Sequence, residues 1–151
     1  MRSWMNGRGC RGDNGPWTIG YGRMVRFRFA RIMSKPMKNW NAVKERFMSD
    51  PLPIRLGNLA ANLSRIKSFS SNEASRDTVA SLIEESKMFI EWTAAQAEIE
   101  VAAKLVELQI QLALWQLQWQ SIWTDPKKRS QVAEQSSMWS KQVLELSGLL
   151  K

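Results

Sequence analysis

Apolar residues recur three or four positions apart through most of the chain after residue 39, which is the spacing of one face of an α-helix. The pattern predicts helices over residues 41–48, 51–68, 72–92 and 94–123, and a last one from 126 to a cap at Gly148. The short first helix carries Trp40, Val43 and Phe47 on one side. The four longer segments each have enough turns to contribute to a common core.

Polar and proline residues mark where these helices begin. Asp50-Pro51 and Asp125-Pro126 each combine an N-cap residue with proline at the first helical position, and Asn72 is an N-cap candidate before the next helix. Each signal satisfies or removes a backbone donor that has no partner within the helix. Three helix starts are therefore predicted from local chemistry alone.

Three further positions refine the boundaries. Thr93 and Gln96 have the spacing of a capping box, which predicts that a new helix starts there. Gly57 costs about 1 kcal/mol relative to alanine inside a helix, so either close packing uses it or the helix begins later.

The segment from Glu107 to Trp123, ELQIQLALWQLQWQSIW, alternates apolar and glutamine residues as a strand would. The alternation changes phase after residue 114, which would place half of a regular strand on the wrong face. A helix accommodates the whole segment and carries two apolar stripes. One comprises Ile99, Ala103, Val106, Ile110, Ala113 and Leu117, and the other Leu105, Leu108, Leu112, Trp115, Trp119 and Ile122. We therefore expect this helix to be central, with partners on two sides.

The fold class follows from these elements. We predict an all-α protein, an antiparallel up-and-down bundle of about four long helices plus a short N-terminal helix, spanning residues 39–151. Residues 1–38 form an Arg- and Gly-rich extension for which we predict disorder, because residues 1–22 lack apolar periodicity. Residues 24–33 alternate apolar and Arg residues and could form a short strand or amphipathic patch, but nothing is predicted to pair with them.

The positive charge of the chain belongs to that extension. Residues 1–38 carry nine basic residues and one acidic residue, a net charge of +8. The whole chain also has a net charge of +8, so residues 39–151 have a net charge of zero. One interpretation is that residues 1–32 follow from a mis-chosen start codon upstream of Met33 or Met37. The other is a real arm that binds nucleic-acid phosphates. Its candidate phosphate-binding residues are Arg23, Arg26, Arg28 and Arg31.

The sequence offers few of the residues that catalytic or metal-binding sites need. The chain has no histidine and a single cysteine, Cys10, which excludes the usual triads, an internal disulfide and Cys/His metal sites. Ser/Lys neighbours near Lys67 and Lys141, and the acidic pairs 84–85 and 98–100, fit solvated helix surfaces better than catalytic or dimetal sites. We expect no enzyme, no cofactor, no metal and no membrane span, in a cytoplasmic protein.

Tryptophan supplies the candidate binding surface. Trp115, Trp119 and Trp123 recur four positions apart, and Gln116 and Gln120 beside them could form an amide-rich rim. The rings could pack in the core, line a groove for a protein partner, or surround an aromatic ligand.

The segments RLGNLAANLSRIKSFS, LIEESKMFIEWTA, LVELQIQLALWQLQW and WSKQVLELSGLL resemble a family of small, functionally uncharacterised helical proteins conserved in cyanobacteria. The resemblance covers roughly residues 39–150. It implies an all-α fold, a cytoplasmic location in a photosynthetic bacterium and a start near Met33 or Met37, and it transfers no catalytic residue.

Three functions remain as hypotheses. The first is a non-enzymatic interaction or scaffold module that binds a protein partner or a second copy of itself. The second is nucleic-acid binding through the basic arm. The third is binding of an aromatic ligand or pigment by the Trp-bearing helix.

Overall fold

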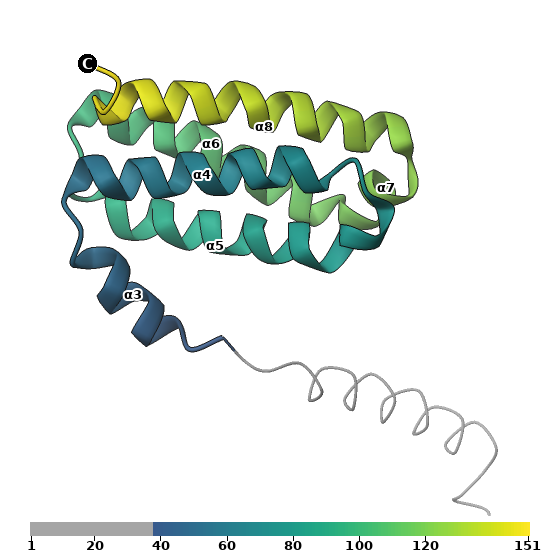
Figure 1. The fold of residues 1–151 in the computed structure, drawn as a ribbon, viewed down its shortest axis with the longest axis horizontal. Helices are drawn as coiled ribbons and strands as arrows, with labels where there is room; N and C mark the ends of the chain where they lie inside the picture. The colour runs from purple at the N-terminus through teal and green to yellow at the C-terminus, as the bar shows by residue number, and fades with distance from the viewer. Residues whose placement is uncertain (1–37) are drawn as a thin grey trace, which may run out of the picture. The chain divides into compact units, whose positions relative to one another are not determined.

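The computed structural model describes residues 38–151, and Figure 1 shows the arrangement of their helices. The predictions for residues 1–37, including the disordered extension, Cys10 and the arginine arm, lie outside the described residues. The elements are α3 (Trp40–Met48), α4 (Leu52–Phe69), the 3₁₀ turn η2 (Glu73–Ser75), α5 (Arg76–Ala94), α6 (Ile99–Leu117), α7 (Trp119–Thr124) and α8 (Pro126–Ser147).

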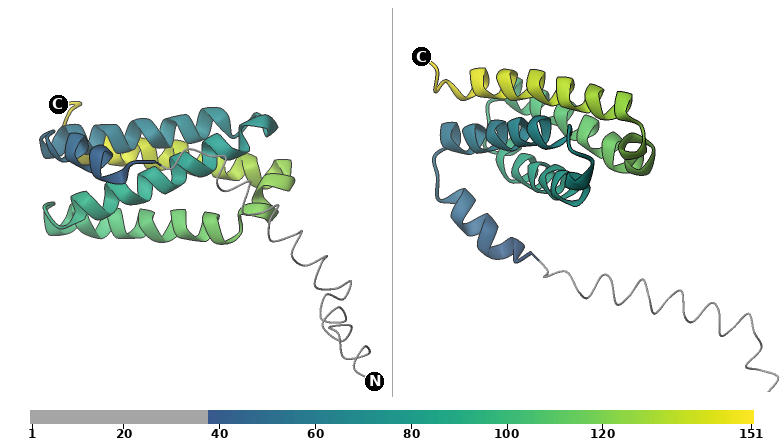
Figure 2. Two further views of the ribbon diagram at one scale, coloured as in Figure 1. Left: turned by 90° about the horizontal axis from the view of Figure 1, so that it is seen from below. Right: turned by 45° about the vertical axis from the view of Figure 1, so that its right-hand side comes forward.

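The predicted all-α fold is confirmed, with no strand among residues 38–151. The four long helices α4, α5, α6 and α8 run alternately in opposite directions with short connections, as in an up-and-down bundle (Figures 1 and 2). The most extensive helix pairings join α4 to α8 and to α5, while α6 packs mainly on α5. The central helix is therefore α4, and the expectation that the segment 94–123 is central is wrong.

Small residues lie where α4 meets α8. Ala60 on α4 and Ser140 on α8 are small side chains at this contact, which lets the two helices approach closely. The Ser140 hydroxyl donates to the Ala60 carbonyl across this contact at 2.7 Å. Large side chains such as Leu63, fully buried on α4, then fill the space among the helices.

The predicted helix ends are confirmed where a residue at the boundary itself ends the helix. The Asp125 carboxylate accepts from the Lys127 backbone N–H at 2.9 Å, and Gly148 ends α8 with φ of 72°. Asn72 caps too, but it begins the turn η2, and α5 follows four residues after it. In α4 the helix begins one residue later than expected, with Pro51 at the N-cap.

The capping box predicted at Thr93 and Gln96 is wrong, because Thr93 is buried within α5 and the Gln96 side chain bonds to a distant residue. Thr93 is buried near the end of α5, and α6 does not begin until Ile99. The Gln96 side chain accepts instead from the guanidinium of Arg55 at 2.6 Å. A distant arginine has replaced the local partner that the spacing predicted.

The continuous helix predicted over residues 94–123 is also wrong at its second end. α6 stops at Leu117, and Gln118 leaves helical geometry before α7 resumes at Trp119. The break places Trp123 so that its indole N–H donates to the Glu73 carbonyl at 2.9 Å, while α7 packs against α8. Strong local helix formers gave no sign of a break that tertiary contacts impose.

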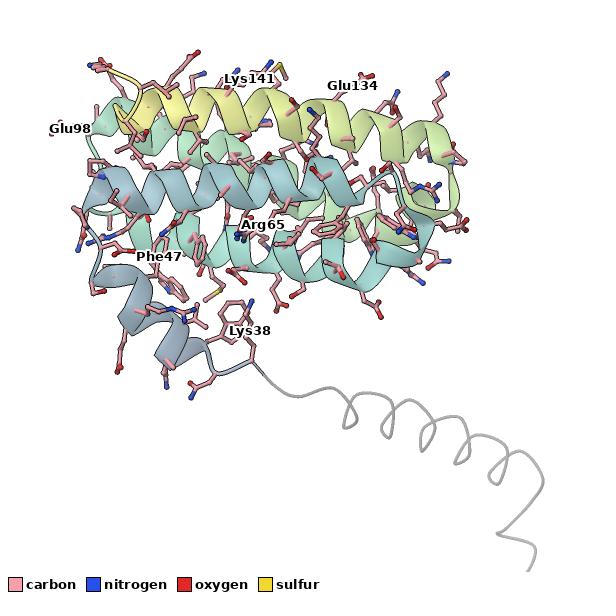
Figure 3. The ribbon with its side chains drawn as sticks, viewed as in Figure 1. Lys38, Phe47, Arg65, Glu98, Glu134 and Lys141 are labelled. Carbon is pink, nitrogen blue, oxygen red and sulfur yellow. The ribbon has the colours of Figure 1, made fainter. Side chains whose placement is uncertain are left out.

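Arg55 joins the two connections at one end of the bundle. Its exposed fraction is only 8%, and it donates to the Asp50 carbonyl at 2.7 Å and the Met48 carbonyl at 3.1 Å. With the bond to Gln96, one side chain ties the α3–α4 connection to the α5–α6 connection. α3 is further held by Phe47, whose ring stacks on Phe89 with centroids 4.1 Å apart; Figure 3 labels Phe47.

Two glycine substitutions should change stability in opposite directions. Gly57 is helical, and an added Cβ would lie 3.0 Å from the Leu149 side chain, whose end is flexible and partly exposed. Gly57→Ala should therefore raise the free energy of unfolding by about 0.5–1 kcal/mol. Gly148→Ala should lower it by about 1 kcal/mol, because Gly148 adopts a left-handed conformation. Chemical denaturation measures both, and a destabilising Gly57→Ala would show that Leu149 cannot move.

Candidate functional site

The most unusual surface of the described chain is an uncovered apolar face of α6, which we call the α6 stripe. It consists of Ile99, Ala103, Val106, Ile110, Ala113 and Leu117. All six are exposed, and the four large side chains leave 85% (Ile99), 52% (Val106), 57% (Ile110) and 83% (Leu117) of their surface in water. Large aliphatic side chains are rarely this exposed in an unbroken row, and such patches mark interaction sites.

The opposite face of α6 is the one that the bundle uses. Leu105, Leu108, Leu112 and Trp115 are all buried in the core. The second apolar stripe of the sequence analysis therefore packs inward through α6 and continues to Ile122 on α7. The first stripe, which was expected to meet another partner helix, meets none among residues 38–151 because α4 occupies the centre of the bundle.

The borders of the α6 stripe differ along its length. Near its N-terminal half lie Glu100, Lys104 and Glu107, and the ammonium of Lys104 lies 3.0 Å from the Glu107 carboxylate. From residue 108 to residue 124 the chain contains no charged residue. The C-terminal half of α6 itself thus carries only amides and apolar groups, a composition typical of the centre of a protein interface. Charged side chains beside it come from neighbouring helices, among them Lys87 on α5 and Lys128 on α8.

The two sides of the stripe face different neighbours. Toward α5, Gln109 donates to Glu91 at 3.3 Å and Gln116 accepts from Lys87 at 2.7 Å. Toward α8 lies a groove of about 240 Å³. Its lining includes Leu114, Trp115 and Val132, and Leu114 is 44% exposed. The apolar surface therefore continues from the stripe into this groove.

The structure separates the three tryptophans of the sequence prediction. Trp115 is on α6 and contributes one wall of the α6–α8 groove, whereas Trp119 and Trp123 are on α7 with ring centroids 5.1 Å apart. Trp115 and Trp123 are buried. The guanidinium of Arg129 lies 5.4 Å from the centre of the Trp123 ring. Most of this aromatic surface packs inside the protein. The break at Gln118 also places Trp115 on a different helix from Trp119 and Trp123, so the three rings do not form the single surface that the sequence predicted.

The two glutamines of the predicted rim are exposed but already bonded. Gln116 accepts from Lys87, and Gln120 accepts from Arg76. Both bonds connect the α6–α7 segment to α5. Gln116 is on α6 next to Leu117 of the α6 stripe, whereas Gln120 is on α7.

Two of the side chains considered for catalysis, Lys67 on α4 and Lys141 on α8, line one open hollow of about 450 Å³. The serines paired with them in the sequence, Ser64, Ser68 and Ser140, are not in its lining. The Ser68 hydroxyl donates to the Ser64 carbonyl at 3.1 Å within its own helix, and Lys141 lies on the outer side of α8 (Figure 3). Glu98 and Glu100 are exposed at the start of α6. Within residues 38–151 no three acidic or cysteine side chains gather as metal ligands would, and no helix is long and apolar enough to cross a bilayer.

A second hollow, of about 270 Å³, lies among α3, α4 and α5. Buried Asn62 lines it. The side-chain oxygen of Asn62 accepts from Arg65 at 3.1 Å, and its side-chain nitrogen has no partner among the described residues. Two cations, Arg46 and Arg65, are matched by two carboxylates, Asp50 and Glu85, in the same lining. The balanced charge favours no class of ionic ligand, and the α6 stripe is the stronger candidate site.

The sequence contained the signal for this site, although it was interpreted as core. The six stripe positions follow spacings of four, three, four, three and four, which is the heptad spacing of helices that pair along a narrow seam. In this bundle only the other stripe of the helix is buried. The uncovered side could not be identified without the positions of α4 and α8.

Comparisons of the chain with protein-family models, with curated proteins and with solved structures find no match. The similarity to a cyanobacterial helical family therefore stays a prediction from the sequence. Function must be argued from the α6 stripe and its surroundings.

Proposed function

We propose that this protein is a non-enzymatic interaction module of the cytoplasm and that it docks its protein partner on the α6 stripe. The observation that carries the proposal is the exposure of four large aliphatic side chains in one row on a well-formed helix. Removing such side chains from water contributes about 25 cal/mol per Å² of apolar surface. A helix that presents this row has a strong physical reason to associate.

The surroundings of the stripe support a protein partner rather than a charged ligand. The run from residue 108 to residue 124 has no charged side chain, and the ammonium of Lys87 beside it is already bonded to Gln116. Its amide groups suit the polar rim of a protein interface, where hydrogen bonds supplement apolar contact. The groove beside Leu114 adds a concave border that a bulky side chain of the partner can enter.

The rigidity of the α6 backbone also suits docking. Its inner face is anchored by Leu105, Leu108 and Leu112, each fully buried. Gln109 and Gln116 add side-chain hydrogen bonds between α6 and α5. A partner therefore meets a preformed surface, which reduces the entropy lost on binding.

Photocrosslinking in cells of the source organism tests the proposal. A photoreactive amino acid replaces Ile110 on the stripe in one variant and Met138 on α8 in the control. Both side chains are more than half exposed, so neither substitution should disturb the core. We expect protein adducts in high yield from position 110 and few from position 138. Equal yields from the two positions would contradict a docking role for the stripe.

A further inference from the structure

We propose that the partner docked on the α6 stripe is a second copy of this chain, with the two α6 helices antiparallel about a two-fold axis. This inference rests on the proposed function and adds the identity and geometry of the partner. It is carried by the order of large and small residues within the stripe, by the charges at the two ends of α6 and by the area of the exposed surface.

The stripe reads nearly the same in both directions. Along the chain its residues are large, small, large, large, small and large. The two most exposed residues, Ile99 and Leu117, are at its two ends. A two-fold axis next to residue 108 places each residue opposite the one at the mirrored position. The facing pairs between copies are Ile99 with Leu117, Ala103 with Ala113, and Val106 with Ile110.

These pairs satisfy the packing requirements of a two-helix interface. Large residues meet large residues of similar exposure, and the two alanine pairs let the helix backbones approach closely at both intermediate positions. The spacing of four and three keeps all six positions on one seam through the whole of α6. An isologous interface needs such a self-complementary surface, because both copies contribute the same patch.

Charge favours the antiparallel arrangement over the parallel one. Glu98 and Glu100 are at the start of α6, whereas its C-terminal half has no charge. A parallel pair would gather four carboxylates at one end, while an antiparallel pair places each acidic end beside the uncharged end of the partner. The opposed helix dipoles are also favourable in this arrangement. Near the axis, Glu107 already has Lys104 at 3.0 Å, which offsets repulsion between the two copies.

The area fits a reversible dimer. The exposed large side chains of the stripe and Leu114 present on the order of 500 Å² per copy, which is about the largest apolar patch of a typical monomer. Two copies then bury on the order of 1,000 Å², the lower range of specific interfaces. We expect a dissociation constant on the order of 10 μM, so the protein should be a mixture of monomer and dimer at micromolar concentrations.

Sedimentation equilibrium of the full chain tests dimer formation. Ile110→Glu should raise the dissociation constant at least about tenfold, because it buries a carboxylate at the seam. Met138→Glu makes the same change on exposed α8 and should leave association unchanged. Circular dichroism verifies that each variant is folded, and Leu117→Glu repeats the test at the end of the seam. A wild-type chain that stays monomeric up to millimolar concentration would overturn the proposal.

Cysteine crosslinking tests the antiparallel register. In a Cys10→Ser background, Ala103→Cys and Ala113→Cys are prepared separately and then mixed under mild oxidation. Residues 103 and 113 of different copies face each other in the proposed register, whereas identical positions lie about 15 Å apart along the axis. Disulfide-linked dimers should form in the mixture and hardly at all in either variant alone. Efficient crosslinking of Ala103→Cys by itself would indicate a parallel pair and overturn the geometry.

The experiments separate the two levels of the proposal. Adducts from position 110 whose mass is that of the chain plus a different protein, combined with a monomeric purified chain, would leave the docking role intact and reject the second copy. Absence of adducts above the control would reject the docking role itself. Adducts of twice the chain mass, together with association lost in Ile110→Glu, support both.

Discussion

Replacing Leu108 with alanine is expected to lower the free energy of unfolding by about 2–5 kcal/mol. Leu108 is fully buried in the core, on the face of α6 that packs against the bundle. The substitution removes apolar contacts and leaves a cavity that neighbouring helices fill only in part. Urea denaturation followed by circular dichroism measures the change.

Ile110→Ala is the matched control for Leu108→Ala. Ile110 lies two positions away on the same helix but leaves 57% of its surface in water. At submicromolar concentration, where a dimer of the expected affinity is dissociated, we expect a loss below about 1 kcal/mol. Comparable losses for the two variants would mean that α6 is rotated about its axis and that the stripe is not exposed.

Replacing Arg55 with alanine is expected to cost about 2–4 kcal/mol, the second largest effect. Three acceptors lose their donor at once: the carbonyls of Met48 and Asp50 and the side chain of Gln96. Hydrogen bonds to charged groups are stronger than neutral ones. Their loss should therefore outweigh the gain from no longer burying a charged guanidinium. Amide hydrogen exchange should show faster opening of both connections, at residues 49–50 and 95–98.

Two further substitutions at Arg55 separate hydrogen bonding from packing. Arg55→Met keeps an unbranched apolar stem but no donor, and should lose nearly as much stability as alanine. Arg55→Lys keeps the charge, yet its compact ammonium cannot reach three acceptors in different directions, so it should recover only part of the loss. A methionine variant as stable as the wild type would show that the three bonds contribute little.

The two faces of α6 place stability and function on one helix without conflict. The inner face supplies core residues, and the outer face supplies the α6 stripe. Substitutions on the outer face should change association while the fold persists. This separation makes the proposed docking role accessible to experiments that a core surface would not allow.

Much of the fold could be predicted because it depends on local chemistry. Helical periodicity predicted each long helix, since each must bury one apolar face. The Asp125-Pro126 start and the Gly148 end of α8 were predicted correctly, because each boundary is determined by groups within a few residues of it.

Errors occurred where distant parts of the chain compete with local signals. Thr93 and Gln96 have the spacing of a helix start, but Arg55, 41 positions before Gln96, takes the glutamine as its acceptor. The residues around Gln118 are good helix formers, yet the helix breaks there and Trp123 bonds to Glu73, 50 positions away. Local propensity is a weak preference that one or two tertiary contacts can outweigh.

The sequence by itself determined that α6 carries two apolar stripes, because both follow from residue spacing. Only the tertiary structure decided which of them is the core. α4 packs against both α8 and α5 at the centre, whereas α6 packs mainly on α5 and keeps one stripe uncovered. Spacing fixes the angle between side chains on one helix, but burial depends on where the other helices lie.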